Sequence, residues 1–195
     1  KSYDKLIKYL LNNNFIVVRV GTIASEKINI NHPNLYDLPY LKKYNHYLNI
    51  YFLSNCHSFI GGDSGVSWLP YINNKNIFLI NYSPFEINNL TMMTGNISFI
   101  FQLIFSKKIN RLLYLSEIIQ LKSKLNSNQL SDDFYFVLNS PQEIFQFYNA
   151  KSKTIQDLHN SFWKIFCKYS NEEYIGINRP FICNDFLIKY QNLIK

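Results

Sequence analysis

Cysteine is scarce in this chain, and its three residues form no recognisable pattern. Cys56, Cys167 and Cys183 are odd in number and far apart, so they make neither a close zinc-type pair nor a redox CxxC motif. Free thiols are typical of a reducing compartment. We therefore expect the chain to be cytoplasmic.

Long apolar runs are also missing. The longest one, Ile97 to Phe105, is far shorter than the roughly 18 residues of a membrane span and contains Gln102. We expect no bilayer-crossing helix and leave open a peripheral contact at the inner face of the membrane. The chain opens with Lys1 rather than Met and shows no signal-peptide pattern, so we expect it to be a piece of a longer protein.

Acidic residues are outnumbered: 13 Asp and Glu face 20 Lys and Arg, which gives a formal net charge of +7. This balance favours anionic partners such as nucleotide phosphates, nucleic acid or an anionic membrane. Only Arg19, Arg111 and Arg179 are arginines, and no RNP, helix-turn-helix or zinc pattern occurs, so we expect no nucleic-acid partner. Lys107 and Lys108, with Arg111, form a compact basic group that fits either a phosphate or membrane contact or a solvated loop.

The remaining composition is that of a folded protein, with 47% hydrophobic and 17% charged residues in 195. A chain of this length holds one core, which predicts a single domain over residues 1–195. Short β-branched runs alternate with helical stripes. The expected strands are 15–20, 58–60, 77–80, 98–105 and 134–138, and the expected helices are 3–11, 47–53, 66–72 and 116–125. Residues 22–43 are expected to form a long loop with one turn of helix.

This alternation predicts an α/β fold with a Rossmann-like parallel sheet flanked by helices. From about residue 140 the pattern is helical, with a break at Arg179-Pro180, and indicates a C-terminal extension. Ser140, Pro141 and Glu143 mark its first helix, since they supply a capping hydroxyl, a first-turn proline and a capping-box carboxylate.

The strongest functional signal is the turn Gly61-Gly62-Asp63-Ser64-Gly65, which joins an apolar strand directly to an expected helix. Glycines let the backbone approach a phosphate closely, and the free N–H groups of a first helical turn point toward it. The alternative is that Asp63 and Ser64 only cap the helix while the glycines make a tight turn. The turn is neither the dinucleotide GxGxxG motif nor a P-loop, so a dehydrogenase or P-loop ATPase is not expected.

Arg19 is the second signal, because it ends an apolar strand just before Gly21 and would be costly to bury without an anion. That anion is either a bound diphosphate or a neighbouring carboxylate such as Asp63. His32 and His57 are the titratable candidates for a base, although a lone histidine is more often structural. Trp68 is expected to pack its helix against the sheet rather than face a sugar.

The segments VVRVG (17–21), YDLPY (36–40) and 48–81 together resemble the C-terminal, donor-binding region of bacterial glycosyltransferases of GT-B type. A looser likeness exists to heptosyltransferases and fucosyltransferase-like enzymes. The likeness covers roughly residues 15–82, with weaker support from 116–119 and 179–187.

This resemblance implies a nucleotide-sugar-binding domain of an enzyme that transfers a sugar from a nucleoside diphosphate to a glycan or lipid-linked acceptor in surface polysaccharide synthesis. It implies that Gly61, Gly62, Ser64 and Gly65 contact the donor phosphates and that Arg19 offsets charge on the leaving diphosphate. Asp63 is then the candidate catalytic residue, and Glu86 is a candidate for binding ribose or sugar hydroxyls, with a solvated loop position as its alternative.

Such chemistry needs no metal and no cofactor besides the donor, and we expect neither. GT-B enzymes contain two Rossmann-like domains, so the N-terminal acceptor domain is expected to be missing from this chain and to be a partner of it. The alternative function is a non-catalytic Rossmann-like module that binds an anionic partner or a membrane surface.

Overall fold

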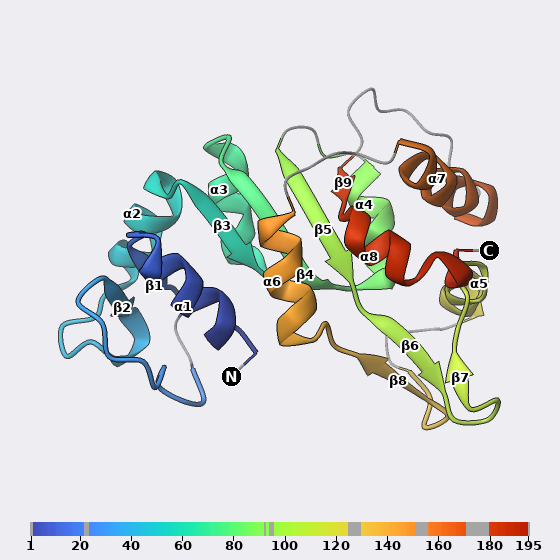
Figure 1. Cartoon of the computed structure of the whole chain (residues 1–195), viewed down its shortest axis with the longest axis horizontal. Helices are drawn as coiled ribbons and strands as arrows, with labels where there is room; N and C mark the ends of the chain where they lie inside the picture. The colour runs from blue at the N-terminus through green and yellow to red at the C-terminus, as the bar shows by residue number, and fades with distance from the viewer. Residues whose placement is uncertain are drawn as a thin grey trace.

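The computed structural model describes residues 2–21, 24–91, 93, 96–124, 130–150, 156–170 and 180–194. These residues build an elongated α/β arrangement of three sheets, of which the central one has helices on both sides (Figure 1). Helices α1 (Asp4–Asn12), α6 (Pro141–Asn149) and α8 (Asn184–Lys189) lie in a row on one side. Helices α2 (His46–Asn55), α3 (Trp68–Ile72) and α4 (Ile87–Thr91) cover the other side.

The central sheet is parallel and has the strand order β3-β4-β5-β9. Its strands are β3 (Ser58–Gly61), β4 (Asn76–Tyr82), β5 (Ile97–Phe101) and β9 (Phe181–Ile182). The expected α/β fold with a Rossmann-like parallel sheet is thus confirmed. Because parallel strands are covered on both faces, their sequences are apolar almost throughout rather than alternating. Strand β4 shows this, since Ile77, Leu79, Ile80 and Tyr82 point to both faces and all four are buried.

At the N-terminal end, β1 (Val17–Arg19) pairs in parallel with β2 (Leu35–Asp37) in a separate two-stranded sheet. The expected long loop over 22–43 does contain one helical turn, the 3₁₀ turn η1 (Leu38–Tyr40), but it also contains the unpredicted strand β2. Three residues of strand are too few to show a periodicity in the sequence. Thr22 and Ile23 lie outside the described residues.

The expected strand 98–105 is divided in two. Strand β5 ends at Phe101, and β6 (Leu103–Ser106) continues into an antiparallel sheet of order β7-β6-β8, with β7 (Arg111–Leu112) and β8 (Phe134–Val137). The division falls at Gln102, whose N–H donates to the Tyr82 carbonyl at 2.9 Å. The expected strand 134–138 is present as β8, and it pairs with β6 rather than with the parallel central sheet. Helix α5 (Leu115–Lys124) agrees with the expected helix 116–125, of which Leu125 lies outside the described residues.

The region after residue 140 begins with the expected capping box: the Ser140 hydroxyl accepts from the Glu143 N–H, and the Glu143 carboxylate accepts from the Ser140 N–H. It is not wholly helical, however. Besides α6, α7 (Gln156–Ser170), α8 and the 3₁₀ turn η4 (Gln191–Leu193), it supplies β9, which pairs with β5. The chain end therefore belongs to the main sheet and its core, where Trp163 is fully buried. The expected break at Arg179 lies outside the described residues, and Pro180 directly precedes β9.

Candidate functional site

The sequence-predicted turn lies at the carboxyl edge of the central sheet. Gly61 is the last residue of β3 and pairs with Leu79 of β4, while Tyr82, the last residue of β4, pairs with Phe101 at the end of β5. The carboxyl ends of three neighbouring strands therefore converge on one edge (Figure 1). This is the edge at which open α/β sheets place their ligand sites.

The turn leads into a shorter helix than expected. Instead of one helix over 66–72, the 3₁₀ turn η2 (Gly65–Ser67) is followed by the five-residue helix α3. Within η2 the Ser67 N–H and hydroxyl both donate to the Ser64 carbonyl, at 2.9 and 2.7 Å. A helix this short contributes little macrodipole, so an anion here would depend on the local N–H groups of the turn.

The glycines of the turn differ in what the fold demands of them. A Cβ on Gly61 would lie 2.8 Å from the ring of Phe59, so glycine is needed there for packing. A Cβ on Gly62 would meet nothing nearer than the Ile80 carbonyl at 3.7 Å, and one on Gly65 would meet nothing within 4 Å. Neither Gly62 nor Gly65 has a positive φ. The fold itself therefore does not explain why these two positions are glycine.

The capping interpretation of this turn is not supported. Ser64 occupies the N-cap of η2, yet its side chain makes no capping hydrogen bond. Ser67, at the N-cap of α3, makes no side-chain capping hydrogen bond either. Residues 62–65 are all solvent-exposed. The turn is thus open to solvent, with the hydroxyl of Ser64 not committed to the helix.

Asp63 and Glu86, the two acids selected from the sequence, come together around Tyr82. The Tyr82 side chain is 1% exposed, and its hydroxyl donates to the Glu86 carbonyl oxygen at 3.0 Å. The same hydroxyl hydrogen-bonds the Asp63 carboxyl. Glu86 lies in the 3₁₀ turn η3 (Pro84–Glu86) and accepts from the Asn89 side-chain amide at 2.6 Å. The two carboxylates are 23 positions apart in the sequence but share one edge of the sheet.

The surroundings raise the pKa of two groups in this cluster, the Asp63 carboxyl and the Tyr82 hydroxyl. Partial burial raises the pKa of the Asp63 carboxyl, the Glu86 charge raises it further, and the Tyr82 hydrogen bond opposes them without cancelling them. Burial, followed by the charges of Asp63 and Glu86, also raises the pKa of the Tyr82 hydroxyl far above its usual value. The ionised form of Asp63 is therefore disfavoured in the folded protein, and hydrogen bonds from the hydroxyl groups of a ligand would stabilise it.

This unfavourable placement predicts the effect of Asp63→Asn on stability. Because the folded state raises the pKa of Asp63, the folded protein binds more protons, and its stability falls as pH rises above about 4. The variant is expected to melt at a higher temperature than wild type at pH 7, and this difference should disappear as the pH approaches 4. Thermal melts at a series of pH values measure it. Asp132→Asn, at an exposed acid far from the edge, is the matched control, and an equal gain there would contradict the assignment.

A local distortion of β4 shapes this edge. Asn81 has a φ of 52°, and the pairing of β4 with β5 is irregular between Leu79 and Tyr82. The Asn81 N–H donates to the Asn139 side-chain oxygen at 2.7 Å, and the Asn139 N–H donates back to the Asn81 side chain at 2.6 Å. This reciprocal pair holds a backbone conformation that non-glycine residues seldom adopt. Bulges of this kind are common beside active sites, where they redirect a side chain, here Tyr82.

Arg19 forms a salt bridge with Asp37. Its Nε donates to Asp37 Oδ1 at 2.6 Å, its Nη2 lies 2.6 Å from the same oxygen, and its Nη1 donates to the Glu26 carbonyl at 2.9 Å. The guanidinium also lies over the Tyr40 ring, 5.4 Å from its centre. The carboxylate partner is thus Asp37 and not Asp63. The charge of Arg19 is already neutralised by Asp37, so a phosphate bound there would compete with that carboxylate.

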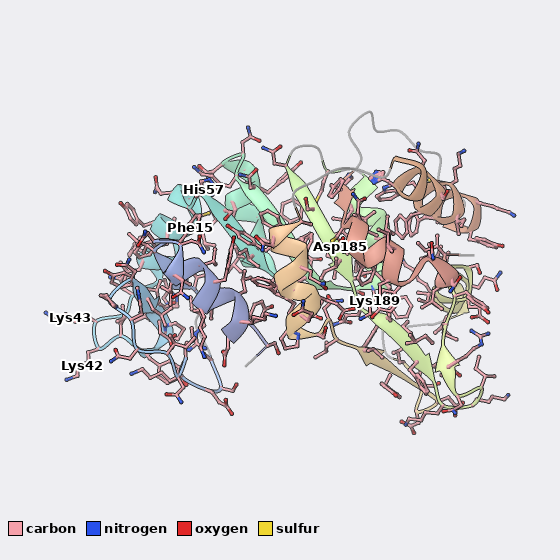
Figure 2. The ribbon with its side chains drawn as sticks, viewed as in Figure 1. Phe15, Lys42, Lys43, His57, Asp185 and Lys189 are labelled. Carbon is pink, nitrogen blue, oxygen red and sulfur yellow. The ribbon has the colours of Figure 1, made fainter. Side chains whose placement is uncertain are left out.

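The other residues considered from the sequence lie away from this edge. His57 precedes β3 and contacts the Phe15 ring at 6.3 Å, which places it at the amino end of the strand (Figure 2). Three strand residues separate it from Gly61, the first residue of the turn, and the distance from His57 to Gly61 is about 13 Å along β3. His32 accepts from the Asn34 N–H at 3.1 Å in the turn before β2. Trp68 does not pack against the sheet as expected, since it is 49% exposed.

The basic group selected from the sequence is likewise remote from the edge. Lys107 and Lys108 lie exposed in the turn between β6 and β7. Arg111 forms two hydrogen bonds with the Glu117 carboxylate, at 2.8 and 2.7 Å.

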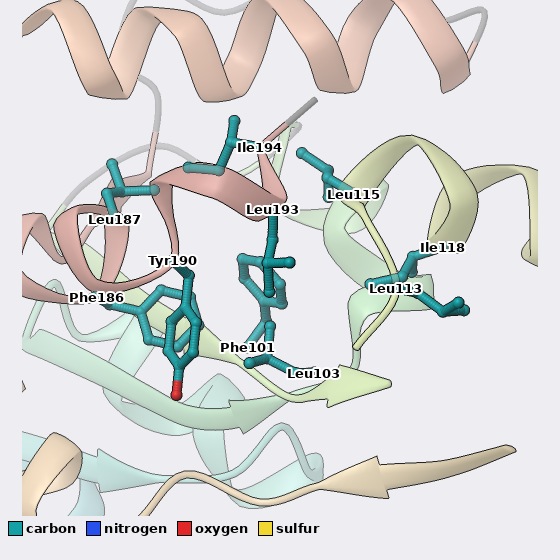
Figure 3. A pocket seen from close by; sticks show the side chains of 10 residues that line it. All are labelled: Phe101, Leu103, Leu113, Leu115, Ile118, Phe186, Leu187, Tyr190, Leu193 and Ile194. Atoms are coloured by element: carbon teal, nitrogen blue, oxygen red, sulfur yellow. The ribbon is translucent and has the colours of Figure 1, made fainter. Parts of the chain in front are cut away.

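Two cavities also lie elsewhere. A gap of about 10 Å³ between β5, α5 and α8 is lined almost wholly by apolar side chains (Figure 3). This is room for one water at most, so it is a packing defect rather than a substrate site. A cavity of about 190 Å³ lies beside Phe78, Ser98 and Phe181, which are neighbours in register on β4, β5 and β9. Phe78 is four residues before Tyr82 on β4, so this cavity does not adjoin the two carboxylates.

Comparisons of the chain with protein-family models, with curated proteins and with solved structures give no match. Among the residues that the structure describes, no group of three or more His, Cys, Asp or Glu side chains is placed to hold a metal ion. Nor does that part of the chain contain a helix with the length and apolarity needed to cross a bilayer. The case for a function therefore rests on the geometry of the carboxyl edge.

The turn, Asp63 and Glu86 were predicted from the sequence, and the structure places them at one edge. Tyr82 was not predicted as a site residue, because in the sequence it resembles an ordinary core residue at the end of an apolar strand. Asp37, the partner of Arg19, and the pair Asn81 and Asn139 were not predicted either. Asn81 did offer a signal, since an asparagine that ends a buried strand is a candidate for a left-handed backbone.

Proposed function

We propose that this chain is the donor-binding domain of a glycosyltransferase and binds a nucleoside diphosphate sugar at the carboxyl edge of β3 and β4. The observation that carries the proposal is the combination at that edge: an open turn with two glycines, Gly62 and Gly65, that the fold does not require, beside the carboxylates of Asp63 and Glu86. Turn N–H groups suit the diphosphate. Carboxylates repel phosphate but accept hydrogen bonds from ribose or sugar hydroxyls, and a nucleotide sugar carries both kinds of group.

In this proposal the residues of the edge have separate tasks. The N–H groups of residues 62–65 and the Ser64 hydroxyl bind the diphosphate and stabilise the negative charge that develops on it as the sugar departs. Glu86 accepts hydrogen bonds from hydroxyls of the donor. Asp63, whose pKa is raised, is the candidate general base for the acceptor hydroxyl. Arg19 supports the loop around Asp37 and acts on the donor only indirectly.

The resemblance to the donor domains of GT-B enzymes supports the same assignment, since it covers β1 to β4 and includes the turn. It extends the proposal to a glycan or lipid-linked acceptor, a partner acceptor domain and a cytoplasmic site of action. No metal enters the proposed chemistry.

The direct test is a titration with UDP, GDP, ADP and CMP, followed through the fluorescence of Trp68, three residues beyond Gly65. Wild type is expected to bind at least one nucleotide. A lost hydrogen bond to a charged group costs about 1.5–3 kcal/mol, so Ser64→Ala should weaken binding roughly ten- to a hundredfold. Gly65→Ala should weaken it similarly by blocking close approach of the phosphate, without a fall in melting temperature, because its Cβ meets open space.

Ser131→Ala, at another exposed serine, is the matched control and should bind as wild type does. The carboxylates are tested separately with Asp63→Asn and Glu86→Gln. These variants should bind inorganic diphosphate at least as tightly as wild type, since negative charge is removed. They should lose transfer of the sugar to an acceptor hydroxyl or to water, measured as release of the nucleoside diphosphate. Absence of nucleotide binding by wild type, or unchanged binding by Ser64→Ala and Gly65→Ala together, would falsify the proposed site.

The second candidate is a non-catalytic Rossmann-like module that binds an anionic surface. It is favoured by the exposed apolar side chains of α2 and α3 together with the surplus of lysine. The nucleotide titration separates the two candidates, because a module without a donor site should not distinguish wild type from Gly65→Ala.

A further inference from the structure

Helix α2 carries an apolar stripe on its solvent side. Tyr47, Ile50 and Tyr51 are 80%, 48% and 62% exposed. They occupy positions i, i+3 and i+4 and so share one side of the helix. The opposite side holds the buried Asn49 and Leu53. A surface helix ordinarily presents polar residues to water, and this helix presents aromatic and aliphatic ones.

Helix α3, a neighbour of α2, also exposes apolar side chains. It packs beside α2 on the same side of the sheets (Figure 1) and exposes Trp68 and Ile72, by 49% and 73%, at positions i and i+4. Trp68 contacts the Tyr71 ring edge-on at 5.7 Å, which holds its indole at the surface. We call the five side chains Tyr47, Ile50, Tyr51, Trp68 and Ile72 the α2–α3 face. Exposed apolar groups gathered on adjacent elements are a mark of an interaction site.

Lysines outnumber acidic residues in the segment that carries the α2–α3 face. Lys42 and Lys43 come five and four residues before Tyr47, and they project from the end of the molecule (Figure 2). Lys75 follows α3. Between Asp37 and Glu86 the only acidic residue is Asp63. A second copy of this chain would bring the same lysines against one another, whereas an anionic surface would attract them.

From these observations we propose that the α2–α3 face docks on an anionic lipid surface, with Tyr47, Tyr51 and Trp68 in the headgroup layer and Lys42 and Lys43 at the lipid phosphates. Tyrosine and tryptophan are the side chains that favour this layer, and lysines beside an apolar face add electrostatic attraction. The proposal does not depend on glycosyl transfer. It does place the Gly61–Gly65 turn, which leads directly into α3, close to the membrane.

Co-sedimentation with vesicles tests the proposal, with phosphatidylcholine alone and with phosphatidylcholine containing phosphatidylglycerol. Wild type should bind the anionic vesicles and not the neutral ones, and added salt should weaken the binding. Removing both charges in Lys42→Gln/Lys43→Gln should lower the partition coefficient roughly 30-fold, at about 1 kcal/mol per lysine. Tyr47→Ser/Tyr51→Ser should lower it at least tenfold, because the apolar contact is lost.

Matched controls come from the opposite end of the molecule. Lys107→Gln/Lys108→Gln makes the same change in net charge in the exposed turn after β6, and Tyr135→Ser removes an exposed tyrosine of β8. Both should bind vesicles within about twofold of wild type. Equal binding to neutral and anionic vesicles, or an equal loss in the controls, would overturn the proposal. So would a concentration-dependent dimer that Tyr47→Ser/Tyr51→Ser abolishes, because the face would then join two copies. None of these outcomes affects nucleotide binding, which is measured without vesicles.

Discussion

Arg19→Ala is expected to lower the free energy of unfolding by about 3 kcal/mol, because it leaves the carboxylate of Asp37 buried without its cation. The Asp37 side chain is only 10% exposed and receives two donors besides its contact with Arg19 Nη2: Arg19 Nε, and the Ile28 N–H at 2.9 Å. The substitution removes the first and leaves the second. Since Arg19 and Asp37 are register partners on β1 and β2, the loss should fall on that two-stranded sheet.

Urea unfolding measures this change, and Arg111→Ala is the matched control. Arg111 contacts Glu117 at a similar distance, 2.7 Å, but the two side chains are 39% and 34% exposed. Its loss should therefore cost far less stability than the loss of Arg19. Nucleotide binding by folded Arg19→Ala should stay within a few-fold of wild type. If Arg19→Ala unfolded like wild type and yet lost nucleotide binding, the guanidinium would be a phosphate ligand and its structural assignment would be wrong.

The central part of the fold could be predicted from sequence because its elements are long and strongly patterned. Strand β4 contains the apolar run 77–80, and the capping box at Ser140 and Glu143 combines several local signals in four positions. The two-residue strands β7 and β9 could not be predicted, because they exist only through pairing with β6 and β5. The end of β5 at Phe101 also depends on a distant contact, the hydrogen bond from Gln102 to Tyr82.

The candidate site was predictable to the same extent. The turn from Gly61 to Gly65 is a local pattern, and its place at the carboxyl edge follows from the strand before it. The partner of Arg19 was not predictable, because Asp37 lies on a strand that the sequence does not reveal. Tyr82 escaped notice for a related reason: its role depends on its hydroxyl lying between Asp63 and Glu86, and those contacts follow from tertiary structure.

The described glycines differ in whether the fold requires them, and this difference supports the proposed site. Gly21 has a φ of 127°, and Gly61 faces the ring of Phe59, so the fold accounts for both. Gly62 and Gly65 have ordinary backbone angles and room for a side chain. Glycine costs backbone entropy in the unfolded chain, so an alanine that fits at such a position usually stabilises the protein. Gly62 and Gly65 are not required by the fold, and the Ser64 hydroxyl beside them makes no capping hydrogen bond. Both observations are consistent with close approach of a ligand.

Glu143 links α6 to the end of the chain, and acid should weaken this link. Its carboxylate, in a side chain that is 10% exposed, accepts from Tyr190 Oη at 2.6 Å, from Lys189 Nζ at 2.9 Å and from the Ser140 N–H at 2.7 Å. Burial by itself would raise the pKa of this carboxyl. The hydrogen bonds from Tyr190, Lys189 and Ser140 outweigh burial and lower the pKa below its usual value.

Glu143→Ala should therefore lower the free energy of unfolding by about 3 kcal/mol, since it leaves Tyr190 and the Ser140 N–H without their acceptor. For a chain of this size that is a fall in melting temperature of roughly 6–12 °C. Lys189→Met should cost far less, because the Lys189 side chain is 54% exposed. Glu143→Gln isolates the charge. Because the folded state lowers the pKa, the charge stabilises the protein above the unfolded pKa of about 4.3, and this contribution is lost as pH falls through the folded pKa. Wild type and Glu143→Gln should thus differ in melting temperature at pH 7 and converge below about pH 4. A difference that persisted unchanged into acid would mean that side-chain shape, and not the carboxylate charge, holds α6 to α8.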